Sequence, residues 1–204
     1  MIKAIIFDNN GVLTDSDKER TITNFAKYFD IREKELAKVF DDFSKPLDDG
    51  SITTLDFYQR IADEFGKGFD KKELNKVHIH SYQPKDGMRE LLLELRNNHD
   101  IALLTNFGDT FDIANERIWN YTEVFDDDKL FVSSKLKMKK PNHDIYLHAL
   151  EKLGREPHET VFIDDRESNL VPARDLGMKT ILFTSPAQCK NELQLLLEEN
   201  NGKK

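Results

Sequence analysis

One pattern restricts the fold of this chain more than any other: a short apolar segment that ends at a polar turn, repeated along the sequence. The segments are residues 2–7, 101–104, 161–163 and 180–183. Short apolar runs bounded by turn-forming residues are typical of buried β-strands. The repeat therefore predicts several strands of one style, each leading into a loop at its carboxyl end.

Stretches with helical signals separate these strand-like segments. They are residues 87–97, 109–120, 142–153 and 170–176. Strands that alternate with helices form a parallel sheet covered on both faces, so we predict an α/β fold. Ligands of such sheets bind beyond the carboxyl ends of the strands. Asp8, Thr105 and Asp164-Asp165 each follow a predicted strand directly, so we expect their loops to meet in one site.

Residues 16–82 interrupt the alternation with helical signals and no convincing strand. Apolar residues recur in this stretch at the spacing of one helix face, among them Phe25, Phe29, Phe40, Tyr58 and Ile61. We predict a separate helical insert at 16–82, with residues 1–15 and 83–204 forming the core. The aromatic stripe either lines a substrate pocket or forms the insert's own core, and this spacing more often marks a core.

The charge of the chain restricts its partners. The formal net charge is -8 at pH 7, whereas nucleic-acid backbones are bound through clustered lysine and arginine. We therefore expect a small-molecule partner and no nucleic acid. The sequence does not distinguish a monomer from a small homo-oligomer.

Apolar runs and cysteine usage restrict the compartment. No apolar run approaches the roughly 20 residues that span a bilayer, so we expect no membrane partner. The segment starting at Met1 lacks the basic start, long apolar stretch and cleavage site of a secretory signal. Cys189 is the only cysteine and has no internal disulfide partner, which suits a reducing compartment. We expect a cytoplasmic protein.

Asp8 is the first candidate for chemistry. A carboxylate held at a strand end can attack as a nucleophile, splitting a difficult displacement into two steps, and can also bind a hard cation. An aspartate after a strand is often only a turn former. Asp8 alone therefore does not decide between these two interpretations.

Other polar residues at strand ends and helix starts support the chemical interpretation. Thr105-Asn106 offers a hydroxyl and backbone amides to phosphate oxygens, Lys140 offers a positive charge, and Asp164-Asp165 offers carboxylates for Mg²⁺. Each has a structural alternative: Thr105 caps the next turn, Lys140 is solvated, or the aspartates cap the last helix. The combination, in this order, favours a phosphate and Mg²⁺ site.

At these residues the sequence resembles the haloacid dehalogenase-like hydrolase superfamily. The similar motifs are Leu104-Thr105-Asn106, Lys140-Pro141 and residues 162–178, and the resemblance covers nearly the whole core. It is most specific toward the N-terminal phosphatase domain of soluble epoxide hydrolases and related sugar-phosphate phosphatases. The resemblance implies a Rossmann-like parallel sheet with an inserted all-helical cap, residues 16–82, that closes over the pocket.

The resemblance also implies a role for each motif residue. Asp8 would be the nucleophile and a Mg²⁺ ligand, and Asp165 would complete the metal site. The residue two positions after the nucleophile, here Asn10, would bind Mg²⁺ through its backbone carbonyl and serve as general acid and base.

The remaining motif residues are implied to handle the phosphate. Thr105 and Asn106 would hold the transferring phosphoryl group. Lys140 would stabilise both Asp8 and the phosphate, and Asp164 would brace Lys140. Together these roles predict a Mg²⁺-dependent phosphatase that forms an aspartyl-phosphate and acts on a small phosphorylated metabolite.

Asn10 departs from the family pattern, which has an aspartate there. An amide keeps its backbone carbonyl for a metal but can neither give nor take the proton, and such a loss typically costs roughly 10²- to 10⁴-fold in rate. A slow natural phosphatase, a repurposed member and a deliberate substitution all fit this residue. Haloacid dehalogenases also lack the second aspartate, but Asp164-Asp165 favours the phosphatase branch. The rival hypothesis is a non-hydrolysing phosphate-binding or regulatory protein.

Overall fold

The computed structural model of the chain describes residues 1–16, 18–48 and 51–201. The chain divides into two compact units. The first, the sheet unit, comprises Met1–Asp15, Pro84–Thr105 and Asn120–Lys204; the second, the helical unit, comprises Ser16–Gln83 and Asn106–Trp119. The helical unit thus contains a second stretch, 106–119, besides the predicted insert at 16–82. The assignment of these units to a catalytic core and a cap stays a prediction.

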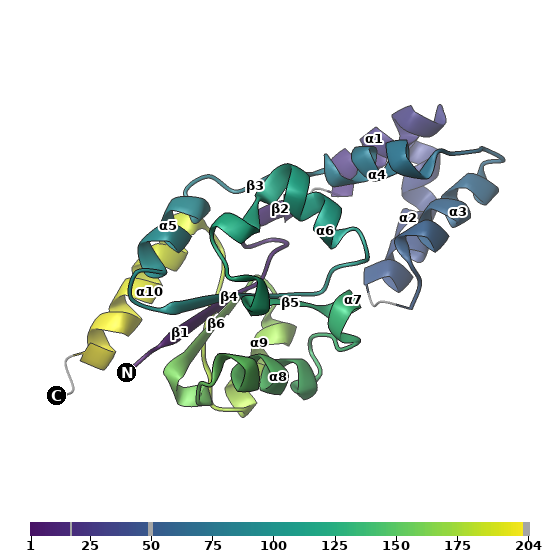
Figure 1. Ribbon diagram of the computed structural model, residues 1–204. Helices are drawn as coiled ribbons and strands as arrows, with labels where there is room; N and C mark the ends of the chain where they lie inside the picture. Colours follow the sequence, from purple (N-terminus) through teal and green to yellow (C-terminus); the bar gives the residue numbers. More distant parts are fainter. Residues whose placement is uncertain (17, 49–50, 202–204) are drawn as a thin grey trace. The chain divides into compact units, whose positions relative to one another are not determined.

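A parallel five-stranded sheet forms the centre of the sheet unit and confirms the predicted α/β class (Figure 1). Its strand order is β5-β4-β1-β6-β7. The strands are β1 Ala4–Phe7, β4 Asp100–Thr105, β5 Leu130–Val132, β6 Thr160–Asp164 and β7 Lys179–Leu182. The sequence pattern missed β5, because three residues are too few to show a periodicity.

Helices cover both faces of this sheet. Figure 1 shows α5 and α10 on one face and α8 and α9 on the other. The bounds of the helices in this unit are α5 Met88–Leu95, α7 Ser133–Leu136, α8 His143–Leu153, α9 Glu167–Asp175 and α10 Pro186–Asn201. Ile145 and Tyr146 of α8 pack with Phe162 of β6 in one fully buried cluster. This covering makes the interior strands apolar on both faces, which is why they read as continuous apolar runs.

The strand register brings the functional loops to one edge. Phe7, the last residue of β1, lies between Leu103 of β4 and Ile163 of β6. The backbone N–H of Asp8 continues the ladder by donating to the Ile163 carbonyl at 2.9 Å. The carboxyl ends of β1, β4 and β6 therefore open onto the same edge of the sheet.

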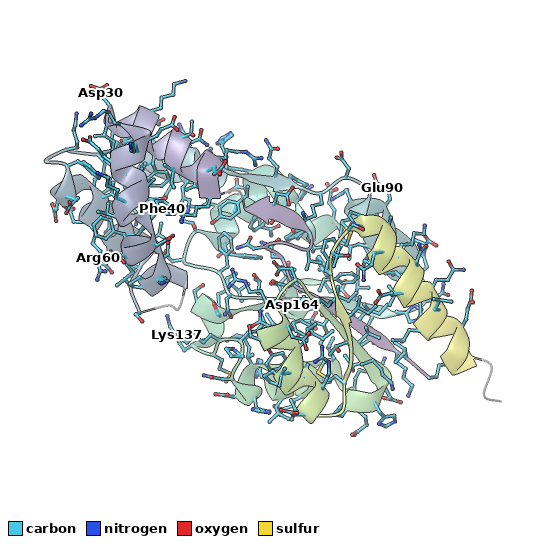
Figure 2. The ribbon with its side chains drawn as sticks, turned by 180° about the vertical axis from the view of Figure 1, so that it is seen from behind. Asp30, Phe40, Arg60, Glu90, Lys137 and Asp164 are labelled. Carbon is cyan, nitrogen blue, oxygen red and sulfur yellow. The ribbon has the colours of Figure 1, made fainter. Side chains whose placement is uncertain are left out.

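The helical unit has its own core. The helices of this unit are α1 Lys18–Phe29, α2 Glu33–Asp48, α3 Thr54–Glu64, α4 Lys71–Ile79 and α6 Phe111–Ala114. A π-helical turn at Asn115–Trp119 follows α6 directly. Phe25, Phe40 and Tyr58 are buried together in one cluster, and Figure 2 labels Phe40 among these helices. The aromatic stripe of the insert is therefore core.

Two short strands each contain a point in the sequence at which one unit ends and the other begins. They are β2 Thr14–Ser16 and β3 Tyr82–Pro84, which pair in a two-stranded sheet. Neither strand has a sequence signal, again because each has three residues. Among the described residues, every helix is too short or too polar to cross a lipid bilayer.

Candidate active site

Asp8 and Lys140 form a buried ion pair at the carboxyl edge of the sheet. Lys140 Nζ lies 2.7 Å from Asp8 Oδ1, and the exposed fractions of the lysine and aspartate side chains are 1% and 8%. Burial raises the pKa of Asp8 to about 7, and the positive charge of Lys140 opposes that rise. An opposite charge this close favours the ionised carboxylate, which is the form that attacks as a nucleophile.

Asp164 holds Lys140 from the other side. Its Oδ2 lies 2.7 Å from Lys140 Nζ, and both residues are buried. Figure 2 labels Asp164 in the sheet unit. The Asp164 carboxylate also accepts hydrogen bonds from the Arg166 backbone N–H at 2.9 Å and from the Asn169 amide at 3.0 Å. With its oxygens engaged in this way, Asp164 orients the lysine, as predicted for a bracing residue.

Asp165 adds a third carboxylate to the same place. Ligand oxygens of Asp8, Asp164 and Asp165 all lie within 4.8 Å of one another. Burial and the neighbouring Asp164 charge raise the pKa of Asp165, because both disfavour its ionised form. Clustered carboxylate oxygens are the donor set that hard divalent cations prefer. The residues present therefore fit Mg²⁺.

Asn10 lies in a tight loop that is closed by hydrogen bonds to the backbone carbonyl of Asn9. The backbone carbonyl of Asn9 accepts from the N–H groups of Val12, Leu13 and Thr14 at 3.2, 2.8 and 2.9 Å. The side-chain oxygen of Asn10 accepts from the Thr14 hydroxyl at 3.3 Å and from the Asn9 amide at 3.4 Å. Two neighbours thus orient the amide of Asn10 through its oxygen.

Thr105 ends β4 at the same edge and carries a buried hydroxyl. Its exposed fraction is 0%, and its Oγ1 has no hydrogen-bond partner among the described residues. Buried hydroxyls without partners are uncommon, because the lost hydration is not replaced. A bound phosphate oxygen would supply the missing acceptor. Asn106 follows directly in the sequence, is half-buried and belongs to the helical unit, and its role in holding phosphate stays a prediction.

Two further residues contribute to the site, and the sequence analysis assigned a role to neither of them. Tyr121 donates from its hydroxyl to the side-chain oxygen of Asn9 at 2.6 Å. No sequence signal connects these residues, because they are 112 positions apart. Asn169, in contrast, stands within the motif at 162–178, and its role as the partner of Asp164 follows only from the geometry.

Comparison with known proteins decides the family. The sequence matches the haloacid dehalogenase-like hydrolases over residues 2–177. The chain belongs to this family. It is therefore a hydrolase, and the resemblance inferred from its motifs is confirmed.

Curated relatives of this hydrolase include phosphatases. The D-ribitol-5-phosphate phosphatase of Bacteroides thetaiotaomicron is 26% identical over 97% of this chain and 99% of its own length. The bifunctional epoxide hydrolase 2 of Rattus norvegicus is 41% identical over 87 residues, which are 43% of this chain and 15% of that protein. The second relation confirms the similarity to soluble epoxide hydrolases, although this hydrolase matches only a small part of that protein.

A solved structure shows the same fold. The crystal structure of a HAD-family enzyme from Bacteroides thetaiotaomicron, in complex with magnesium and inorganic phosphate, superposes with a TM-score of 0.77 at 29% identity. The superposition covers 90% of this chain and 95% of that enzyme. The fold of this hydrolase is thus one on which magnesium and phosphate have been observed together.

Proposed function

We propose that this hydrolase is a Mg²⁺-dependent phosphatase that cleaves a small phosphorylated metabolite through an aspartyl-phosphate on Asp8, with its proton-transfer step weakened by Asn10. The observation that carries this proposal is the buried contact of Asp8 with Lys140, 2.7 Å long, beside the carboxylate of Asp165. A carboxylate kept from solvent next to a fixed cation is prepared to attack an anionic phosphate ester. The relatives' names, which include a sugar-alcohol phosphate phosphatase, support the same reaction class.

Asp8, Asp165 and the backbone carbonyl of Asn10 would hold Mg²⁺. The bound ion would supply positive charge that neutralises the phosphate oxygens and lowers the repulsion between an anionic nucleophile and an anionic substrate. Asp164 is not needed as a ligand, because its oxygens already accept from Lys140, Asn169 and the Arg166 backbone.

The first step is a displacement at phosphorus. A carboxylate oxygen of Asp8 forms a bond to phosphorus while the ester oxygen leaves with the electron pair of the broken P–O bond. Thr105 donates from its buried hydroxyl to a phosphoryl oxygen, and Lys140 stabilises the negative charge. Asn106, by its position in the Thr105-Asn106 motif, is assigned to the same phosphoryl group.

The second step releases inorganic phosphate. Water attacks the phosphorus of the aspartyl-phosphate, the bond to the Asp8 oxygen breaks, and the carboxylate is regenerated. An aspartate at position 10 would protonate the leaving alkoxide and then take the proton of the water. Asn10 does neither, so both protons are exchanged with solvent and both steps slow down.

Substrate choice is assigned to the helical insert. We propose that residues 16–82 act as a cap that closes over a small phosphorylated metabolite, since closure of this kind excludes water and completes a site. The cytoplasmic location and the assembly as a monomer or a small homo-oligomer stay predictions.

The experiment that tests this function compares two substrates in the Asn10→Asp variant. An alkyl leaving group depends heavily on a proton donor, whereas an aryl leaving group does not. The substitution should raise turnover of an alkyl phosphate by about two to four decades and that of an aryl phosphate far less. Equal gains for both esters would show that residue 10 is not the general acid. No Mg²⁺-dependent turnover of either ester would favour a phosphate-binding protein instead.

A further inference from the structure

Asn9 lies between the proposed nucleophile and the proposed acid position, and it is fully buried, with an exposed fraction of 0%. Its backbone N–H donates to the Asp8 carboxylate, and its backbone carbonyl closes the loop onto Thr14. Its side-chain NH₂ donates to Asn10 Oδ1 at 3.4 Å. The orientation of Asn9 therefore affects both functional neighbours.

The side-chain oxygen of Asn9 is held by Tyr121. The phenol hydroxyl donates to Oδ1 at 2.6 Å, and the second nearby donor, the Thr14 hydroxyl, is farther away at 3.5 Å. Tyr121 is itself buried, with an exposed fraction of 6%. A buried hydrogen bond of this length contributes more to orientation than one that competes with water.

The backbone around Tyr121 is also fixed. Its carbonyl accepts from the N–H groups of Val124 and Phe125 at 2.9 and 2.7 Å, and its ring meets the Phe125 ring edge-on, with centroids 5.5 Å apart. Asn120 precedes it in the left-handed region, with φ 47° and ψ 45°, a conformation that asparagine tolerates better than most residues. The hydroxyl is therefore presented from a rigid turn.

We propose that Tyr121 is a positioning residue that acts through Asn9 on the side chain at position 10. This inference rests on the proposed function, because it assigns a task to the same site. An amide has one accepting and one donating end. Since Tyr121 donates to the oxygen, the NH₂ end of Asn9 must face residue 10 and hold the oxygen of that side chain.

The same geometry suits the Asn10→Asp variant. One oxygen of the introduced carboxylate would accept the Asn9 amide hydrogen, leaving the second oxygen for proton transfer to and from substrate. Without the phenol hydroxyl, the side-chain oxygen of Asn9 keeps only the longer contact with the Thr14 hydroxyl, at 3.5 Å, so the Asn9 amide holds that carboxylate less firmly. Misplacement of a catalytic group by as little as about 1 Å costs up to about 10²-fold in rate.

The kinetic test introduces Tyr121→Phe into the Asn10→Asp protein. We expect kcat for an alkyl phosphate to fall by about tenfold or more at unchanged KM, with a much smaller fall for an aryl phosphate. A variant that only damages the fold would lower kcat for both esters to the same extent. Tyr28→Phe is the matched control, since it removes a hydroxyl that accepts from the Asp70 backbone N–H in the helical unit at 2.8 Å and should change neither rate. Asn9→Ala should cause the same selective loss, and adding Tyr121→Phe to it should cost nothing more.

A second readout needs no activity. In the protein with Asn10 intact, Tyr121→Phe should shift the side-chain ¹H–¹⁵N amide signals of Asn9 and Asn10, and Tyr28→Phe should not. Unchanged amide signals would overturn the inference, and so would equal losses for both esters. Shifted signals in a chain whose Asn10→Asp form hydrolyses no phosphate would support the Tyr121–Asn9–Asn10 linkage and refute the phosphatase proposal alone.

Discussion

The Asp165 carboxylate occupies the space that a side chain on Gly11 would need. A Cβ built on Gly11 collides with the carboxylate of Asp165, and Gly11 has φ +90°, in the region that favours glycine. Glycine is thus required at this position for two independent reasons. The close approach places the carboxylate beside the loop that carries Asp8 and Asn10, which is what a shared cation needs.

Gly11→Ala should therefore displace Asp165 and weaken Mg²⁺ binding. We expect a loss of about 10- to 100-fold in affinity, the range for changes that disturb the support of a metal ligand. Calorimetric titration measures it, with Asp165→Ala as the reference for a lost ligand. Gly154→Ala is the matched control, because Gly154 also has a positive φ, +62°, but its added Cβ would meet nothing within 4 Å. If Gly11→Ala binds Mg²⁺ as tightly as Gly154→Ala does, Asp165 is not a ligand.

Lys140→Met should destabilise the protein strongly. The substitution leaves the buried carboxylates of Asp8 and Asp164 facing each other without a cation, and breaking a buried pair costs about 3–5 kcal/mol. Urea denaturation without Mg²⁺ measures the change in the free energy of unfolding. Lys190→Met removes an exposed pair with Glu94, 3.1 Å long, and should cost less than about 1 kcal/mol. Equal losses in the two variants would contradict the burial argument.

His78 should make stability depend on pH. Burial lowers its pKa from the ordinary value of 6.5 to about 4, and its Nδ1 lies 3.0 Å from the Tyr58 hydroxyl. At pH values between these two pKa values, His78 is protonated in the unfolded chain but not in the folded chain. The contribution of neutral His78 to the free energy of unfolding is therefore fully present above pH 6.5. It is lost as the pH falls toward the lowered pKa, by up to about 3 kcal/mol.

Denaturation curves of His78→Gln measure this contribution. The variant should lose the part of the pH slope that belongs to His78, about 1.4 kcal/mol per pH unit at most. His80→Gln, which changes an exposed histidine two residues farther along the same chain segment, is the control for replacing a histidine at the surface. A slope that survives His78→Gln would assign the effect to other groups.

The sequence predicted those features that depend on neighbours in the chain. Apolar runs before Asp8, Thr105 and Asp164 identified the central strands, and their order implied that these residues share one edge. The bracing of Lys140 by Asp164 was implied by the family resemblance, and the structure places the two atoms 2.7 Å apart.

The features that the sequence did not predict depend on distant pairs or on very short elements. The strands β2, β3 and β5 have three residues each, which is too short for a periodicity. The stretch 106–119 carries an ordinary helix signal, and only tertiary packing places it with the helical unit. Tyr121, at the start of the short 3-10 turn Tyr121–Glu123, contacts Asn9 only through tertiary packing, and no local sequence pattern encodes that contact.

The most direct test of the central claim is covalent phosphorylation of Asp8. Acetyl phosphate has a good leaving group, so attack by Asp8 needs no acid, whereas hydrolysis of the acyl-phosphate needs a base that Asn10 cannot be. With Mg²⁺ and acetyl phosphate, intact-protein mass spectrometry after rapid acid quench should show one added phosphoryl group. It should be less abundant in Asn10→Asp and absent in Asp8→Ala. No adduct in the parent protein, or an undiminished adduct in Asp8→Ala, would contradict the assignment of Asp8 as the nucleophile.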